Sequence, residues 1–304
     1  MKKIFLSLCL LAAAGMMYAQ TEYYVSVDGK DSNAGTERKP FLTLKKALEE
    51  ARKESGEVVV FMREGVHRLD ETIVLTEADG HEGKKLCLRS YPGEKVVVSG
   101  GKELELKWKI YKDGIVQAKI DDEGVMDMLV VNGEIRHMAR FPNFDADAVR
   151  FNGTSAEATS PERVMKWKHP ETGFMHAMHQ SDWGDFHYRI TGRDDKGNLT
   201  LEGGWQNNRQ SGLHPENRMV ENIFEELDAP GEWFYDKQEQ MLYYYPMPGE
   251  DVETATIEVP QLKHLFEIKG KKESPVSNVS IEGLCLTQTL RTFMEKYEPL
   301  LRSD

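Results

Sequence analysis

The chain has 304 residues, of which 51 are acidic and 39 are basic, giving a formal net charge of −12 at pH 7. This acidic balance argues against nucleic acid and anionic membrane surfaces as partners, because both are bound through clustered Lys and Arg. The length permits one large domain or two smaller ones.

The first 20 residues have the layout of a secretory signal peptide. Two lysines precede an almost wholly apolar run from Ile4 to Met17, and Ala19 offers a small residue for cleavage. The run is shorter than the roughly 20 residues that a membrane-spanning helix needs, and no later segment approaches that length. We therefore predict that residues 1–19 are removed and that the mature protein is exported, to the periplasm or the cell exterior, with no membrane span.

The mature chain opens with strand formers over Tyr23–Val27, followed by a loop rich in Gly, Asp and Asn over residues 28–36. Oxygens spaced over Asp28–Asn33 are able to hold calcium, but the EF-hand spacing and its terminal Glu are missing, so a tight turn is favoured. A helix is predicted over Thr43–Lys53, because apolar residues recur there at helical spacing. They are Phe41, Leu44, Ala47, Leu48 and Ala51.

Short β-branched runs separated by turn residues follow Gly56. They are Val58–Phe61, Ile73–Leu75, Leu86–Leu88 and Val96–Val98. So many strands with so few helices between them exclude a doubly wound α/β fold. They fit a sandwich, a barrel or a parallel β-solenoid, and no strict sequence period chooses among these.

The pattern changes to antiparallel hairpins from about Leu104. Asn132-Gly133 lies between two apolar runs and is a strong hairpin signal. Turn residues also separate strand-like runs around 194–198 and 236–241, whereas 142–169 is rich in loops. The alternation of the first part returns after Pro260, broken at Asn278 and Gly283, which are able to turn corners.

Two cysteines, Cys87 and Cys285, remain after signal cleavage, each within an apolar strand-like run. Buried structural thiols are favoured over a disulfide, because an isolated Cys behaves as a small hydrophobe. The chain has no CxxC motif and no Cys/His cluster, so no structural zinc and no cofactor is predicted.

Residues 23–52 resemble the amino-terminal cap of exported, right-handed parallel β-helix proteins of the pectate-lyase-like class. The matching residues include Tyr24-Val25-Ser26, Gly35-Thr36, Lys39-Pro40-Phe41 and Thr43-Leu44. In that class the helix covers the open end of the solenoid, where stacked strands otherwise invite edge-to-edge pairing.

Further segments resemble a narrower group of bacterial β-helix enzymes, glycoside hydrolase family 141, whose activities include fucosidase and xylanase. They include Val131-Asn132-Gly133, Ala139–Asn143, Leu227–Trp233 and Leu242–Pro246. The resemblance implies a mainly β protein, namely a right-handed parallel β-helix with an N-terminal capping helix and an inserted antiparallel β-rich module. The boundaries that we predict are a signal peptide (1–19), cap and first coils (20–103), the inserted module (104–260) and a resumed β-helix (261–304).

Members of that group continue for hundreds of residues and carry their catalytic carboxylates in later coils. The chain is therefore expected to be the front portion of such an enzyme, with catalytic residues beyond Asp304. Its partner is expected to be a polysaccharide or oligosaccharide. A polysaccharide lyase on the same scaffold and a non-catalytic glycan-binding module are the alternatives.

Two polar and aromatic clusters are the candidate substrate-binding residues, because sugars offer hydroxyls to polar groups and C–H faces to aromatic rings. One has His176 and His179 with Asp182 and Trp183, and the other has Trp205, Asn207, Arg209 and His214. For Trp183 and Trp205, burial as core anchors is favoured over a role in sugar binding. The histidines are also able to ligate a metal, although the HExxH arrangement is absent.

Glycoside hydrolysis needs two carboxyl groups about 5 to 9 Å apart. The densest acidic run comprises Glu221, Glu225, Glu226, Asp228 and Glu232. Such a run is more often a solvated face than a catalytic pair. Arg140 and Arg302 are able to pair with acidic sugars, although a surface salt bridge is the commoner role of Arg.

Overall fold

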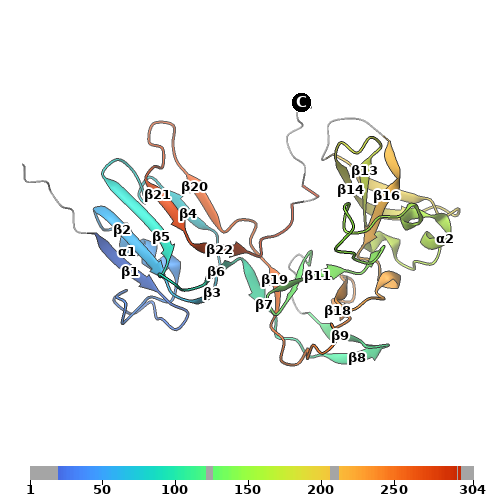
Figure 1. The fold of residues 1–304 in the computed structure, drawn as a ribbon, viewed down its shortest axis with the longest axis horizontal. Coiled ribbons are helices and arrows are strands. Elements are labelled where there is room, and N and C mark those ends of the chain that lie inside the picture. Colours follow the sequence, from blue (N-terminus) through green and yellow to red (C-terminus); the bar gives the residue numbers. More distant parts are fainter. Residues whose placement is uncertain (1–19, 121–125, 206–211, 293, 296–304) are drawn as a thin grey trace, which may run out of the picture. The chain divides into compact units, whose positions relative to one another are not determined.

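The computed structural model describes residues 20–120, 126–205, 212–292, 294 and 295 (Figure 1). Within them strands far outnumber helices, which confirms the prediction of a mainly β chain. No helix in this part of the chain is both long enough and apolar enough to cross a membrane. The signal-peptide prediction for residues 1–19 lies outside the described residues.

The chain forms two compact units. Unit 1 consists of Met1–His67, Thr72–Val98 and Phe266–Leu286, and unit 2 consists of Arg68–Glu71, Ser99–Leu265 and Thr287–Asp304. Each unit therefore contains segments that are far apart in sequence.

Unit 1 contains one helix and three small sheets. Its elements are β1 (Thr21–Val25), α1 (Leu44–Ala51), β2 (Gly56–Met62), β3 (Gly65–Arg68), β4 (Ile73–Thr76), β5 (Lys84–Ser90), β6 (Val96–Ser99), β20 (Phe266–Lys269), β21 (Val279–Glu282) and β22 (Leu284–Thr287). The sheets have the strand orders β1-β2-β5-β21, β20-β4 and β22-β6-β3.

The first sheet of unit 1 is parallel throughout, and its register stacks apolar side chains. Val60 lies opposite Leu88, and Leu88 lies opposite Ile281. Val60 and Leu88 are fully buried. Strands β2 and β5 belong to the first sheet, β4 belongs to the second, and β3 and β6 belong to the third. Later in the chain, β20, β21 and β22 belong to the second, first and third sheet, respectively. From β2 onward, strands of unit 1 that follow one another in sequence therefore belong to different sheets.

Helix α1 begins one residue after its predicted start and ends two before its predicted end. The Thr43 hydroxyl caps it by accepting a hydrogen bond from the Lys46 N–H at 3.1 Å. Its buried face consists of the predicted residues Leu44, Ala47, Leu48 and Ala51. The helix exists because this apolar stripe is buried, since eight residues are too few for a stable isolated helix.

Asp31 organises the loop before α1. Its carboxylate accepts hydrogen bonds from the N–H groups of Leu42 and Thr43 and from the Thr43 hydroxyl, each at 2.9 Å. These three donors occupy the side chain, which favours the turn interpretation of Asp28–Asn33 over calcium binding.

Unit 2 contains an eight-stranded sheet and a five-stranded sheet, of orders β7-β19-β10-β11-β17-β18-β9-β8 and β12-β16-β13-β14-β15. The strands of the first are β7 (Gly101–Glu103), β8 (Lys109–Lys112), β9 (Ile115–Lys119), β10 (Leu129–Val131), β11 (Glu134–Met138), β17 (Glu232–Asp236), β18 (Met241–Tyr244) and β19 (Ile257–Pro260). Those of the second are β12 (Arg140–Phe141), β13 (Phe174–His179), β14 (Asp185–Arg193), β15 (Leu199–Gly203) and β16 (Leu213–Glu221), and the short helices of the unit are η1 (Ala156–Thr159), α2 (Pro161–Val164), η2 (Pro170–Thr172) and η3 (Phe224–Glu226).

The predicted hairpins of unit 2 are confirmed. Strands β10 and β11 pair antiparallel across Asn132 and Gly133, both of which have positive φ angles as this turn requires. The turns at 194–198 and 236–241 likewise join antiparallel pairs, β14 with β15 and β17 with β18. The β11–β17 pair of unit 2, by contrast, is parallel.

The prediction for the cysteines is right for Cys87 and wrong for Cys285. Cys87 is buried in β5, whereas Cys285 is exposed, and neither forms a disulfide. The physical reason is that β22 is an edge strand of its sheet, so no neighbouring strand lies along one of its sides and its side chains have fewer neighbours to bury them.

We predict that replacing Asp31→Ala destabilises the protein by about 1–3 kcal/mol, because three donors at the start of α1 lose their acceptor. Equilibrium urea unfolding, followed by circular dichroism, measures the change. Asp28→Ala, at an exposed position of the same loop, is the control and is expected to unfold at the wild-type midpoint. Equal midpoints for the two variants would contradict the assigned role of Asp31.

Candidate functional site

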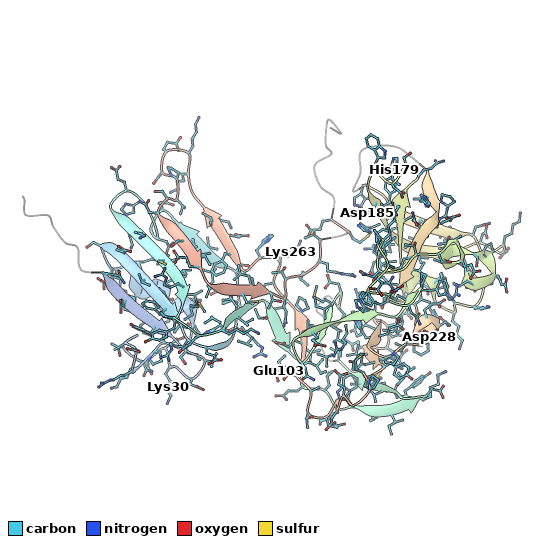
Figure 2. All side chains as sticks on the ribbon, in the orientation of Figure 1. Lys30, Glu103, His179, Asp185, Asp228 and Lys263 are labelled. Carbon is cyan, nitrogen blue, oxygen red and sulfur yellow. The ribbon has the colours of Figure 1, made fainter. Side chains whose placement is uncertain are left out.

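Three of the seven candidate substrate-binding residues lie on the five-stranded sheet of unit 2, and two more lie next to its strands in sequence. His176 and His179 lie on β13, Trp183 lies in the turn before β14, and His214 lies on β16. Trp205 follows β15 and is half-buried. The other two candidates, Asn207 and Arg209, lie outside the described residues. Figure 2 labels His179 and Asp185, which mark the end of β13 and the beginning of β14.

A buried ion network lies within this sheet. The Glu221 carboxylate of β16 is 3.1 Å from Nε2 of His176 and 3.1 Å from Nη1 of Arg291. The backbone N–H of Arg291 donates to Asp127 at 3.2 Å. A fifth member, His187 of β14, lies opposite His176, and their Nδ1 atoms are 2.7 Å apart.

The electrostatics of this network fix its hydrogen-bond directions. Burial alone raises the pKa of Glu221, but the charges and hydrogen bonds of His176 and Arg291 outweigh it and hold that pKa far below the usual range. Burial, followed by the charge of His176, lowers the pKa of His187 to about 4. A neutral His187 accepts at Nδ1, so both ring nitrogens of His176 face an acceptor. The carboxylate of Glu221 is therefore committed to two partners, the His176 ring and the Arg291 guanidinium.

A second polar cluster lies at the β13–β14 turn and is centred on Asp182. This carboxylate accepts from Arg150 at 2.8 Å and from the side-chain amide of Asn217 at 3.3 Å. Nε2 of His214 lies 3.9 Å from it, while Nδ1 of the same ring accepts from the backbone N–H of Asn217. We refer to Arg150, Asp182, His214 and Asn217 as the turn cluster.

Trp183 stands next to the turn cluster with 66 % of its surface exposed. The core-anchor interpretation is therefore wrong for this residue. The physical reason is that Asp182 has a positive φ of 57° and turns the chain tightly, which directs the next side chain away from the core. An indole so exposed offers an aromatic face to a ligand.

His179 does not join the turn cluster. Its ring is buried, stacks on Phe186 and accepts from the backbone N–H of Ser181 at Nδ1. His179 therefore shapes the β13–β14 turn rather than facing a substrate. In the part of the chain that the structure describes, no group of three or more His, Cys, Asp or Glu residues converges as a metal site.

Arg140 has a structural role that the sequence did not indicate. It is buried, and its guanidinium donates to the carbonyls of Pro142, Phe151, Asn152 and Gly153 at 2.7–3.3 Å. The geometry contradicts the predicted pairing with an acidic sugar, since the guanidinium is buried and its Nε and Nη2 donate to carbonyls inside the fold. The other arginine of that prediction, Arg302, lies outside the described residues.

The loop that Arg140 holds is strained. Three consecutive residues, Phe151, Asn152 and Gly153, have positive φ angles of 48°, 50° and 125°. Two of them are not glycine, and such residues pay a conformational cost that the surroundings must offset. The hydrogen bonds from one buried guanidinium to the carbonyls of these residues offset that cost.

The strained loop forms one wall of an open cavity of about 430 Å³. Its lining includes Asn143, Asp145, Thr154, and two members of the turn cluster, Arg150 and Asn217. The turn cluster thus supplies two residues to the cavity lining, and Trp183 directly follows its Asp182 in sequence. We take the cluster, the cavity and Trp183 together as the candidate site.

The expectation that the acidic run 221–232 is a solvated face is wrong for three of its members. Glu221, Glu226 and Glu232 are all buried. Glu226 accepts from Nε1 of Trp167 at 2.8 Å and from Arg163 at 2.7 Å, which makes it part of a folded core. Burial raises the pKa of Glu232 to about 8, although two backbone N–H groups donate to it.

Sequence reasoning missed His187, Arg150, Asn217 and Arg291 as members of these networks. His187 could have been found from the hairpin register, because pairing 175–178 with 185–188 places it opposite His176. The others have no local signal, since loops or distant strands bring them into place.

Comparisons with known proteins give a fold but no family. No family model matches the chain. A stretch of 77 residues is 42% identical to YwoF, an uncharacterized protein of Bacillus subtilis (strain 168), and covers 25% of this chain and 15% of YwoF.

Among solved structures, a glycoside hydrolase is similar over 90% of this chain, with a TM-score of 0.71 and 22% sequence identity. This chain spans 51% of the length of that protein. The structure of XylC with xylose is matched over 88% of this chain and 35% of that one, at a TM-score of 0.41 and 14% identity, which is too weak to carry an argument. The likeness to the glycoside hydrolase shows a shared fold.

We predict that Glu221→Gln destabilises the protein by about 3–5 kcal/mol, because it removes the buried charge that His176 and Arg291 contact. Glu216→Gln, at an exposed position of the same strand, is the matched control and is expected to change stability by no more than about 0.5 kcal/mol. Urea unfolding measures both, and similar values for the two variants would rule out the network as a stabilising element.

The raised pKa of Glu232 predicts a pH dependence of stability. A carboxyl whose pKa is raised in the folded protein stabilises the folded state fully at pH values below its pKa in the unfolded chain, near 4.5. This stabilisation is lost as the pH rises through the pKa in the folded protein, about 8. Glu232→Gln keeps an oxygen acceptor for the backbone donors and cannot ionise. Its melting temperature is therefore expected to exceed that of the wild type by roughly 3–8 °C at pH 8.5, with the gap closing by pH 5.

Differential scanning calorimetry between pH 5 and pH 9 (about one-unit steps) provides this measurement. The exposed Glu253→Gln variant is the control for the loss of one surface charge. A gap between Glu232→Gln and the wild type that stays constant with pH would show that Glu232 is ionised in the folded protein.

Proposed function

We propose that this chain is the front portion of an exported glycoside hydrolase that acts on complex plant-type polysaccharide by a two-carboxylate mechanism. The catalytic carboxylates are proposed to lie beyond Asp304. The observation that carries the proposal is an exposed indole, Trp183, next in sequence to the turn cluster, two of whose members line an open polar cavity. The shared fold with a glycoside hydrolase of about twice the length supports it.

The architecture that we propose is a right-handed parallel β-helix, capped by α1 and interrupted by an inserted module over 104–260. The parallel pairing of β1, β2, β5 and β21 supports it, as does the fixed order in which successive strands visit three sheets. Right-handed crossovers are expected on general grounds, because a twisted strand returns to a parallel neighbour that way in nearly all proteins. The chain leaves this winding order between β6 and β20.

The candidate site suits a glycan for chemical reasons. A sugar ring stacks its C–H face on an aromatic ring, while its hydroxyls both donate and accept. Trp183 provides the ring, Asp182 provides acceptors, and Arg150 and Asn217 provide donors. The strained loop held by Arg140 gives the cavity a fixed wall, which reduces the ordering cost of binding.

The buried carboxylates are poor candidates for catalysis. Glu221 is committed to His176 and Arg291, and Glu232 is buried within β17. This observation favours a second candidate function, in which the chain binds glycan without cleaving it. A lyase acting on uronates is less supported, because Arg140 is turned inward and bonded to carbonyls.

Export to the periplasm or the cell exterior is part of the proposal. It rests on the basic, apolar and small-residue pattern of the first 20 residues.

We predict that the purified mature chain binds fucosylated glycan, xylan or pectin without turnover. Trp183→Ala is expected to weaken binding roughly tenfold, because a stacking ring contributes about 1–2 kcal/mol. Ile135→Ala, at another exposed apolar position, is the control and is expected to bind as the wild type does. Affinity electrophoresis with each polysaccharide measures retention.

Product analysis of the same incubations separates the candidate functions. Binding with no product supports the proposal for this chain. New reducing ends without an unsaturated product contradict the assignment of catalysis to residues beyond Asp304, and an unsaturated product shows a lyase. Loss of retention in Ile135→Ala to the same extent as in Trp183→Ala rules out the candidate site.

A further inference from the structure

A second cavity, of about 270 Å³, lies in unit 2 and shares no lining residue with the first. It is built from four aromatic rings on separate elements, namely Tyr111 of β8, Phe224 of η3, Phe234 of β17 and Tyr243 of β18. No role for this cavity follows from the function proposed above.

The four rings hold one another in place. Tyr111 lies edge to face against Tyr243 and Phe224, with centroids 5.1 Å and 5.9 Å apart. Phe224 meets Tyr243 at 5.0 Å and Phe234 at 5.3 Å in the same geometry. Edge-to-face packing is favourable for aromatic rings, so the cavity has a rigid apolar wall before any ligand arrives. Tyr111 is still 38 % exposed and remains accessible.

Polar groups surround these rings with unused hydrogen-bonding capacity. Asp236 uses one carboxylate oxygen to accept from the backbone N–H groups of Gln238 and Glu239. Glu225 uses one oxygen to accept from the backbone N–H of Lys168. Within the described residues, the Glu239 carboxylate and the hydroxyls of both tyrosines form no hydrogen bond. Burial, followed by the charges of Tyr111, Asp236 and Glu239, raises the pKa of Tyr243, so its hydroxyl keeps its proton.

The charges around the cavity discriminate among ligand classes. Three carboxylates, Glu225, Asp236 and Glu239, face one lysine of the lining, Lys168, which disfavours an acidic sugar. An organic cation is disfavoured as well, because the ammonium of Lys112 already lies 5.7 Å from the Tyr111 ring centroid. A neutral polyhydroxyl ring uses both the acceptors and the donors.

We propose that this cavity is a separate binding site for a neutral sugar ring of a glycan. The ring stacks on the aromatic wall, and its hydroxyls donate to Asp236 and Glu239. The volume lies below the roughly 300–1,000 Å³ of sites for drug-sized ligands, which fits a single sugar unit. The proposal does not depend on the candidate site, since the two cavities share no residue.

Saturation-transfer NMR and calorimetric titration of the whole chain test this site. The probes are D-xylose, L-fucose, D-galactose and D-glucose, with D-galacturonate and choline as charged comparators. At least one neutral sugar is expected to bind saturably in the millimolar range. Tyr111→Ala and Glu239→Gln are each expected to weaken that binding at least fivefold.

The neighbouring Ile110→Ala is the matched control for Tyr111→Ala, because Ile110 is 85 % exposed and does not line the cavity. Both mutated cavity residues are exposed, and circular dichroism checks that each variant is folded. Trp183→Ala separates the two sites, because it is expected to leave monosaccharide binding here unchanged while it weakens polysaccharide retention. The proposal is overturned if no neutral sugar binds, if choline or galacturonate binds more tightly, or if Tyr111→Ala binds as the wild type does.

Discussion

A buried carboxylate is the constraint on which unit 2 depends. Glu221 lies at the end of β16, and its partners come from β13 and from the segment at Arg291, so one side chain joins three parts of the chain. A charge in a low-dielectric interior is tolerated only when opposite charges and hydrogen bonds surround it. The position of β13 against β16, and therefore of the turn that carries Trp183, is tied to this requirement.

The exposed part of the candidate site rests on a second buried ion. Arg140 lies opposite Glu221 in the β12–β16 pair, and its guanidinium gathers carbonyls from the strained loop 151–153. Charges near it reinforce this arrangement, because Glu221 and Glu232 oppose the lowering of the Arg140 pKa by burial. The core thus fixes a loop conformation that isolated residues would avoid, and this loop shapes the cavity wall.

The two cavities of unit 2 differ in their physical character. The first is bordered by ion-paired polar groups beside one exposed indole, whereas the second has an interlocked aromatic wall and unused acceptors. Two separate sites strengthen the binding of an extended glycan, because binding at one site raises the effective concentration of the glycan at the other.

Local sequence determined the elements whose causes are local. The stripe Leu44, Ala47, Leu48 and Ala51 specified helix α1, and Asn132-Gly133 specified a hairpin because its backbone conformation is one that few other residues adopt. The sequence did not determine which residues of the acidic run 221–232, or which tryptophans, are buried, because burial depends on which distant strands cover a residue. Only tertiary structure buried Glu221 beside Arg291, which is 70 residues away in sequence. It also exposed Trp183 at a tight turn and turned Arg140 inward against the loop 151–153.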